Sequence, residues 1–437
     1  MEAAGAPSFS FTAYLRLLGE NRNFRLLWLA QVVSELGDWL YAVAVYSLLL
    51  QLTGKAESVG LAVVLQLLPQ VLVAPTAGVL NDRLNRRAIM VAADIARMFI
   101  VLGMMMVTSA ERVWLVWILL FTETVMWALF EPGRTALIPN IVTSKDKLLV
   151  ANALSSSTWA INLALGSGLG GLLLWKFGRT SVFAINAASF AVSALLLLRM
   201  RVRETHAANL PPFRLADLFD FKPIWDGIQY VRGHAGRLST LLVKAGMGLT
   251  GAHWVLLPVF GERIFPIEGS GALSMSLLFS ARGVGAFIGS FASGYWAKND
   301  ERKMRSGIFF AFLITAAAYT ALGFAPALWL ACLYVAIGHA GSSMAWVFST
   351  TLLHKMTHDE FRGRVFSADF AGLFLTMSAV SYAAGELIDL GIPVRTLAVC
   401  SGLLGLLPAA LWGIAQRSDL TGKPAGCDQQ QPPRGLA

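Results

Sequence analysis

The chain has 437 residues, of which 56% are hydrophobic and only 14% are charged, whereas soluble domains carry about 25% charged residues. Its apolar residues form runs of roughly 20, the length of a helix that crosses a hydrocarbon core about 30 Å thick, so we predict an all-α polytopic membrane protein and exclude a transmembrane β-barrel. The formal net charge of +9 does not indicate a nucleic-acid partner, because the basic residues lie at the ends of the apolar runs and not on one soluble face.

The chain starts with a segment, residues 1–23, that has too little apolar length for a cleavable signal peptide. Within it, residues 9–19 are expected to form either an amphipathic helix on the membrane surface or a disordered lead-in. Twelve spans are then predicted. They lie near 25–52, 57–80, 88–109, 112–131, 150–175, 180–199, 239–262, 271–296, 306–324, 327–350, 364–389 and 393–415.

The predicted spans divide into two halves of six helices. Residues 24–199 form the N-terminal half and residues 238–415 form the C-terminal half. Between them, residues 200–237 are expected to be a linker with an amphipathic helix around 214–233. Residues 416–437, rich in Gln, Pro and Gly, are expected to be a disordered tail.

The distribution of basic residues predicts the orientation. If both termini lie on one side of the membrane, most of the 35 Lys and Arg residues fall on that side. Cytoplasmic loops accumulate Lys and Arg, so we expect both termini and the linker to be cytoplasmic. The opposite side receives Lys55, Arg112, Lys176, Arg179, Arg263 and Arg395.

The cysteines predict no special chemistry. Cys332 and Cys400 lie inside apolar runs, and Cys427 lies in the tail. Neither their number nor their spacing indicates a disulfide framework or a metal site, and we expect no cofactor.

A short basic loop, GVLNDRLNRR at 78–87, joins the second and third spans. It resembles the loop of the major facilitator superfamily with the pattern Gly-x-Leu-Ala-Asp-Arg-x-Gly-Arg-Arg/Lys. The matching residues are Gly78, Leu80, Asp82, Arg83, Arg86 and Arg87, and Asn81 and Asn85 replace a small residue and a glycine.

This loop is expected to act as a cytoplasmic gate. Asp82 would pair with an arginine and face the N-terminal end of the eleventh span near 362–366, because a helix N-terminus favours a carboxylate. Gly78 would allow the helices to approach closely. A weaker copy of the pattern at 293–303 follows the eighth span, which is typical of transporters built from two repeated halves with a substrate site between them.

Other stretches resemble the efflux branch of this superfamily, which includes macrolide exporters and the enterobactin exporter. These stretches are residues 24–40, 93–97, 131–142, 148–157 and 362–369. The fold hosts many cargoes, so the resemblance does not identify the substrate.

The fifth span contains LGSGLGG, in which Gly166, Gly170 and Gly171 resemble the exporter motif Gly-Pro-x-x-Gly-Gly, with Ser167 in place of the proline. Glycines four residues apart let two helices approach closely. We expect an exporter-type packing seam, and ordinary small-residue packing is the alternative.

Charged residues inside the spans are the main functional candidates, since each costs at least ~2.5–3.5 kcal/mol at the bilayer centre. Glu35 and Asp38 lie three apart on one helical face and are candidates for proton coupling; a structural pair is the alternative. Glu123 is a third proton-coupling candidate. Arg282 is grouped with these acids as a candidate counter-ion, or as a contact for an anionic cargo.

Three other sets of charges are given structural roles. Asp94 and Arg97 are expected to form an internal ion pair. Lys244 is expected to extend its ammonium group toward a membrane surface. Asp369 and Glu386 flank the eleventh span and are expected to be gate or interface groups.

In this superfamily helices 1, 4, 7 and 10 line the central cavity, and the resemblance nominates polar and aromatic residues on them. An aromatic cavity suits an amphipathic or lipophilic cargo, although most tryptophans are expected to pack against neighbours or to sit at the membrane interface. The candidates are Trp39, Tyr41, Trp127, Phe130, His253, Trp254, His339 and Trp346.

The sequence therefore predicts a secondary active exporter of amphipathic or lipophilic small molecules, of the drug or siderophore type, working by proton antiport. A lysophospholipid mover, a nutrient importer and a non-transporting membrane sensor are the alternatives, and an enzyme is not expected. The sequence contains no Gly-x-x-x-x-Gly-Lys-Ser/Thr stretch, which is the motif that binds ATP phosphates, so we do not expect ATP to drive transport. We expect a monomer in a bacterial inner membrane, with a small-molecule substrate, protons and the lipid bilayer as its partners.

Overall fold

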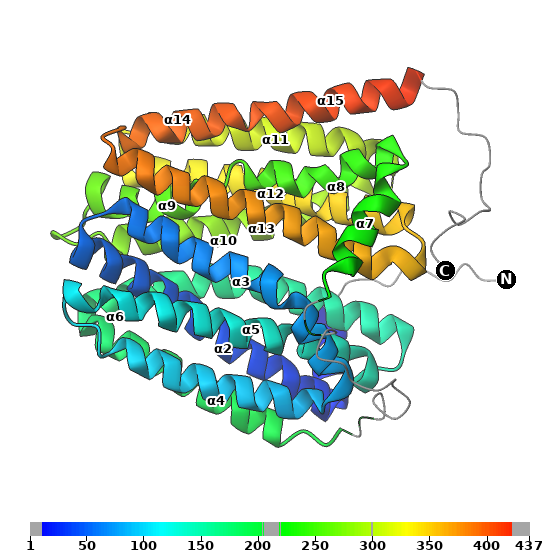
Figure 1. Ribbon diagram of the computed structural model, residues 1–437, viewed down its shortest axis with the longest axis horizontal. Helices are drawn as coiled ribbons and strands as arrows, with labels where there is room; N and C mark the ends of the chain where they lie inside the picture. The colour runs from blue at the N-terminus through cyan, green and yellow to red at the C-terminus, as the bar shows by residue number, and fades with distance from the viewer. Residues whose placement is uncertain (1–10, 203, 205–217, 219, 299, 422–437) are drawn as a thin grey trace.

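The computed structural model describes residues 11–202, 204, 218, 220–298 and 300–421. These residues are almost entirely helical, and the one β-bridge among them joins Ile267 and Ser270. The first residues of the expected N-terminal helix, the linker residues 203, 205–217 and 219, and most of the tail lie outside the described residues. The all-α prediction is confirmed for the described chain (Figure 1).

The N-terminal half begins with a short helix, α1, that packs on the bundle through the buried Leu17. Lys147 donates a 2.7 Å hydrogen bond to Glu20 at the end of α1; this bond and the lysine's charge hold the pKa of the Glu20 carboxyl below its ordinary value. The elements of this half are α1 Phe11–Glu20, α2 Arg22–Thr53, α3 Ala56–Arg83, α4 Arg86–Met104, a 3-10 turn Ala110–Arg112, α5 Val113–Ile141 and α6 Lys145–Leu198.

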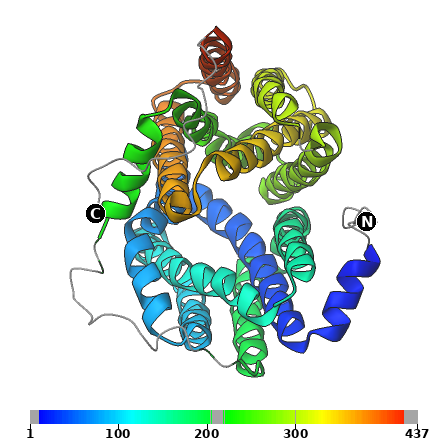
Figure 2. The ribbon, with the colours of Figure 1, turned by 90° about the vertical axis from the view of Figure 1, so that its right-hand side faces the viewer.

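The C-terminal half follows α7, an amphipathic helix that lies across the end of the bundle (Figures 1 and 2). The helix α7 comprises Lys222–Arg232. The elements of the C-terminal half are α8 Ala235–Gly248, α9 His253–Val259, a π-helical turn Phe260–Ile264, α10 Ala272–Ala297, α11 Glu301–Gly323, α12 Leu328–Met356, α13 Asp359–Asp389, α14 Val394–Leu404 and α15 Leu406–Thr421.

Ten segments of the described chain are long and apolar enough to span a membrane, whereas the sequence predicts twelve spans. Two features account for the difference. The helix α6 reverses at Gly178, whose φ of 77° and ψ of 171° are not helical, so it contains two of the expected spans. The helix α4 has only 19 residues and includes Arg86, Arg87, Asp94 and Arg97, which lower its hydropathy.

The two halves make direct contact at one end of the bundle, which we call the closed end. Asp389 at the end of α13 accepts hydrogen bonds from the backbone N–H groups of Ala56 and Glu57, at 3.0 and 2.8 Å, and so caps the first turn of α3. Arg263 lies 3.7 Å from Asp389 and donates to the carbonyl of Gly54 at 2.8 Å. Polar contacts therefore join the halves around this rim.

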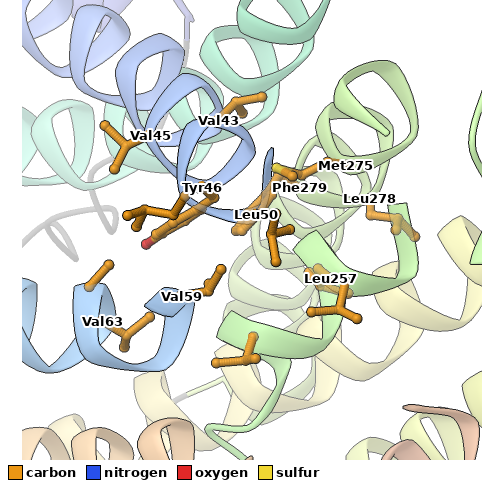
Figure 3. Close-up of a cluster of buried hydrophobic side chains, with 14 of the residues drawn as sticks. Val43, Val45, Tyr46, Leu50, Val59, Val63, Leu257, Met275, Leu278 and Phe279 are labelled. Carbon is orange, nitrogen blue, oxygen red and sulfur yellow. The ribbon is translucent and has the colours of Figure 1, made fainter. Parts of the chain in front are cut away.

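Below this rim lies a layer of buried apolar side chains from both halves, which we call the seal: Tyr46, Leu50, Val59, Leu257 and Phe279 (Figure 3). The rings of Tyr46 on α2 and Phe279 on α10 stack with centroids 6.0 Å apart. The Tyr46 hydroxyl donates a 2.5 Å hydrogen bond to the side chain of Gln66 on α3, and the other four seal side chains are hydrocarbon groups, so the seal disfavours water between the halves at this end.

The opposite end, which carries α1 and α7, is the open end. We find no hydrogen bond or ion pair there between described residues of α2–α6 and α8–α15. A cavity of about 220 Å³ lies among α3, α7 and α13 on this side. It is lined by Gln70, Val71, Ala74, Ile224, Gly363, Phe366, Ser367, Phe370, Ala371 and Phe374. Among the described residues, the hydrogen bonds that join the halves therefore lie at the closed end and midway along α6 and α10.

Candidate functional site

A buried charge cluster lies inside the N-terminal half, and Arg97 of α4 is at its centre. The guanidinium donates to both carboxylate oxygens of Asp38 at 2.8 Å, and to Glu123 at 2.8 Å through Nε. Phe190 covers the guanidinium at 4.1 Å. Arg97 is only 2% exposed, so three helices, α2, α4 and α5, are joined through a single cation.

The predicted pair of Asp94 with Arg97 is the longest contact in this cluster, at 4.0 Å. Asp94 instead accepts a 2.5 Å hydrogen bond from Ser193 of α6, and its other oxygen has no hydrogen-bond donor. The expectation that Arg282 neutralises Asp38 or Glu123 is wrong, because Arg97 occupies that position. Three carboxyl groups thus share one guanidinium.

Glu35 lies one turn before Asp38 but has a separate environment. It accepts hydrogen bonds from the side-chain amides of Gln31, at 2.9 Å, and Asn162, at 3.1 Å. Gln31 in turn accepts a bond of 2.9 Å from Arg134, which also pairs with Glu131. Among the described residues, no cation lies within ion-pair distance of Glu35.

A second polar cluster lies in the C-terminal half beside the seal. Arg282 of α10 donates through Nε to Nε2 of His339 at 2.9 Å, and Nδ1 of His339 lies 2.9 Å from the hydroxyl of Tyr319. The guanidinium stacks over Trp254 at 4.0 Å. The rings of His253 and His339 meet edge to face at 4.8 Å. Four helices, α9 to α12, therefore meet at this point.

The two clusters approach each other through Trp39 of α2. Its indole stacks on Trp254 across the interface, with centroids 6.3 Å apart, and contacts Trp159 of α6 edge to face at 6.0 Å. Arg282 lies 5.9 Å from the same indole. Since Trp39 follows Asp38 and lies four residues after Glu35, one turn of α2 connects the acids to the aromatic contact between the halves.

The other cavity candidates are distributed differently from the prediction. Tyr41 packs on Phe183 and Phe130 joins a hydrophobic core, so both lie inside the N-terminal half and not between the halves. Trp127 is half-buried on α5. Trp346 covers Lys244 at 4.5 Å.

The prediction that Lys244 extends to a membrane surface is wrong. Its side chain is fully buried and pairs with Asp369 of α13. The rings of Phe366 and Phe370 add further contacts to the ammonium group, at 5.5 and 4.7 Å. This pair joins α8 to α13, whereas Glu386, near the closed end, accepts a hydrogen bond from Tyr382 at 2.8 Å.

The basic loop lies at the open end, and its expected contact with α13 is not made in this conformation. Asp82 pairs with Arg86 at 3.6 Å and its side chain is 68% exposed. Nothing lies within 4 Å of a Cβ placed on Gly78. Arg87 donates to the carbonyl of Met200 at 2.5 Å, which ties the loop to the end of α6. The predicted gate and the role of Arg83 in it stay predictions.

The glycines of the fifth span lie at close helix contacts. A Cβ on Gly166 would meet Trp39 at 2.8 Å, and one on Gly170 would meet the α2 backbone at Leu40 at 2.9 Å. Gly171 faces Ser276 of α10. The glycines therefore pack α6 against α2 within one half and against α10 across the interface.

Sequence reasoning missed four polar side chains that complete these clusters: Gln31, Arg134, Asn162 and Tyr319. All four lie within apolar helices, where a polar group needs a partner. That rule singles them out, but it does not say with which helix each one bonds.

The chain is similar to known membrane proteins over most of its length. A family described as "Transmembrane secretion effector" matches residues 18–418. The chain is 22% identical to a protein named putative bacilysin exporter from Bacillus subtilis, over 82% of this chain and 86% of the relative. It is 24% identical to macrolide efflux protein A of Streptococcus pyogenes, over 81% of this chain and 86% of the relative.

Solved structures show the same fold. A crystal structure of a bacterial homologue of the human lysosomal transporter Spinster, in an inward-facing and unoccupied conformation, covers 94% of this chain and 98% of its own, with a TM-score of 0.68 and 14% identity. A POT family transporter in complex with a thioalcohol-conjugated peptide covers 91% and 96%, with a TM-score of 0.72 and 11% identity. The predicted major facilitator fold is confirmed.

Proposed function

We propose that this chain, which belongs to the transmembrane secretion effector family of major facilitator transporters, exports amphipathic or lipophilic small molecules by proton antiport. The names of its relatives, an exporter and an efflux protein, support the direction of transport. The single observation that carries the proposal is a cluster of charged and aromatic side chains, among them Trp39 and Arg282, beside a one-sided seal between two halves.

This arrangement suits alternating access. The halves are joined by the rim and the seal at the closed end, and the cavity among α3, α7 and α13 lies at the open end, so a cargo would enter from one side only. Rocking the halves would break the polar rim around Asp389 and bring α3 and α13 together at the open end. The binding site would then face the other side of the membrane.

The open end is the cytoplasmic end in this proposal. It carries the basic loop 78–87 and α7, and short cytoplasmic loops are enriched in Lys and Arg. The described conformation would therefore be inward-facing, with both termini in the cytoplasm of a bacterium. Cargo would enter from the cytoplasm or from the inner leaflet.

Glu35 is the proposed proton carrier. It lies on the same face of α2 as Trp39, four residues away, and its hydrogen-bond partners are neutral amides. Protonation would remove its charge without leaving a cation unpaired. Asp38 and Glu123, by contrast, share Arg97, and we assign them to a structural and coupling role. Each proton that enters gains ~2.3 kcal/mol per 100 mV of membrane potential.

Transport in inverted membrane vesicles tests this proposal. A proton gradient is established, and its collapse is followed when macrolides, lipophilic cations or siderophores are added. We expect cargo-dependent proton release by the wild type, no release by Glu35→Gln, and normal release by the control Glu111→Gln, since Glu111 is exposed in a loop. Release that persists in Glu35→Gln would contradict the assignment of the carrier. No release with any compound would contradict drug antiport.

A further inference from the structure

Arg282 is a buried cation without a carboxylate partner. Its side chain is 5% exposed and begins roughly 15 Å along α10 at 1.5 Å per residue, deep within a candidate span. Among the described residues, no Asp or Glu lies within ion-pair distance, and the Nη1 donor has no hydrogen-bond acceptor. A buried charge in this state is costly unless another group supplies the missing interaction.

Its protein neighbours are neutral. Because Nε of Arg282 donates to Nε2 of His339, that nitrogen carries no proton, and Nδ1–H of His339 donates to Tyr319. His253 is arranged alike: Nδ1 faces the carbonyl of Thr250 at 2.9 Å, which leaves Nε2 as a buried acceptor without a donor. The cluster thus presents one unused charged donor and one unused neutral acceptor.

The position of this cluster indicates access from the open end. Phe279 of the seal lies one helical turn before Arg282 on α10, on the side of the closed end. Trp39 and Trp254 stack across the interface beside the guanidinium. The cation therefore lies one helical turn from the seal, on the side of the open end, and beside the aromatic contact between the halves.

We infer that Arg282, Trp254 and Trp39 form a binding site for a small oxyanion, a carboxylate or a phosphate, attached to a flat apolar group of the cargo. The guanidinium supplies planar donors that fit such an anion. The two indoles supply apolar faces for the rest of the molecule. This inference rests on the proposed function, since it narrows the cargo to organic anions.

Binding to the full-length protein in detergent tests the inference without requiring transport. The probes are naphthylacetate, its uncharged analogue naphthylacetamide, and naphthyl phosphate, which share one ring system. A probe that binds the folded protein raises its thermal unfolding temperature, and at one fixed concentration the rise is larger for the probe that binds more tightly, because the stabilisation grows with the logarithm of the ratio of concentration to Kd. We expect at least one anion to bind the wild type about tenfold or more tightly than the amide, and the preferred anion distinguishes carboxylate from phosphate.

Variants test whether Arg282 causes the preference for an anion over the uncharged amide. Arg282→Gln should abolish it, Arg282→Lys should retain part of it, and the control Arg112→Gln, at an exposed loop arginine, should leave it unchanged. If Arg282→Gln does not fold, the Arg282→Lys variant and the wild-type comparison decide. Equal behaviour of anions and amide in the wild type, including no binding of either, or a preference that persists in Arg282→Gln, would overturn the inference.

Different results would overturn the proposed antiport and the inferred anion site. Proton release that is driven by a carboxylate cargo and is unchanged in Arg282→Gln vesicles would overturn the anion site and leave the exporter intact. An anion preference that depends on Arg282, in a protein whose vesicles show no proton release with carboxylate cargoes, would overturn antiport and leave the site.

Discussion

Asp38 receives two hydrogen bonds of 2.8 Å from the guanidinium of Arg97, which lies on a different helix of the same half. The next residue, Trp39, stacks on Trp254 of the C-terminal half, with ring centroids 6.3 Å apart. The charge cluster and the aromatic contact between the halves are therefore consecutive along the chain. A change in the charge of the cluster acts directly on the helix that carries Trp39.

Replacement of Arg97 by Gln should destabilise the protein strongly. The change leaves Asp38, Asp94 and Glu123 in a buried space without their shared cation, and breaking a buried pair costs about 3–5 kcal/mol. Thermal unfolding in detergent measures the loss. The control Arg112→Gln should unfold like the wild type, and the double variant Asp38→Asn/Arg97→Gln should lose less than the sum of the single changes. Additive losses would show that the two residues are not coupled.

The pair of Lys244 and Asp369 should behave as a structural pair. Each single change, Lys244→Met or Asp369→Leu, leaves one charge buried, whereas the double change removes both and leaves apolar side chains of similar volume. We expect each single variant to lose several kcal/mol and the double variant to recover most of the loss. A double variant as unstable as the worse single variant would contradict this.

The sequence was sufficient to predict the helical spans because their length and apolar character are local properties. The partners of the charged residues are not local. Asp94 and Arg97 are three apart, which favours a pair, but α2 and α5 bring Asp38 and Glu123 closer to the same guanidinium. Spacing along one helix contains no information on which other helices approach it.

Lys244 illustrates a second limit of prediction from the sequence. The predicted span 239–262 placed it near a membrane end, whereas α8 starts at Ala235 and the helical path breaks between Gly248 and His253. The earlier start moves Lys244 further into the bundle, where it meets Asp369. An error of a few residues in a helix boundary is therefore enough to change an exposed lysine into a buried one.

Widening the α3–α13 contact should open the closed end. A Cβ on Gly385 would lie 2.7 Å from Cα of Glu57, so Gly385→Leu forces the halves apart there. The measurement is maleimide labelling of Val59→Cys, which is fully buried in the seal, in a chain whose native cysteines are replaced by serine. We expect faster labelling with Gly385→Leu than without it.

The matched control for this experiment is Gly294→Leu, because nothing lies within 4 Å of a Cβ at that position. Its labelling rate should equal that of the parent chain. Equal rates in all three chains would show that the Gly385 contact does not determine how the closed end opens.

The Asp82→Asn variant should unfold like the wild type but transport more slowly. In the described conformation Asp82 is 68% exposed and contacts Arg86 only at 3.6 Å, and an exposed pair of this kind contributes about 0–1 kcal/mol. The unfolding temperature should therefore stay close to that of the wild type.

If the loop closes against the N-terminus of α13 when the open end shuts, the Asp82→Asn variant loses a carboxylate from that contact. Cargo-driven proton release should then fall while Glu111→Gln, a surface carboxylate outside the loop, keeps the wild-type rate. A variant that transports normally would contradict the gate, and one that unfolds early would assign Asp82 a structural role in the conformation described here.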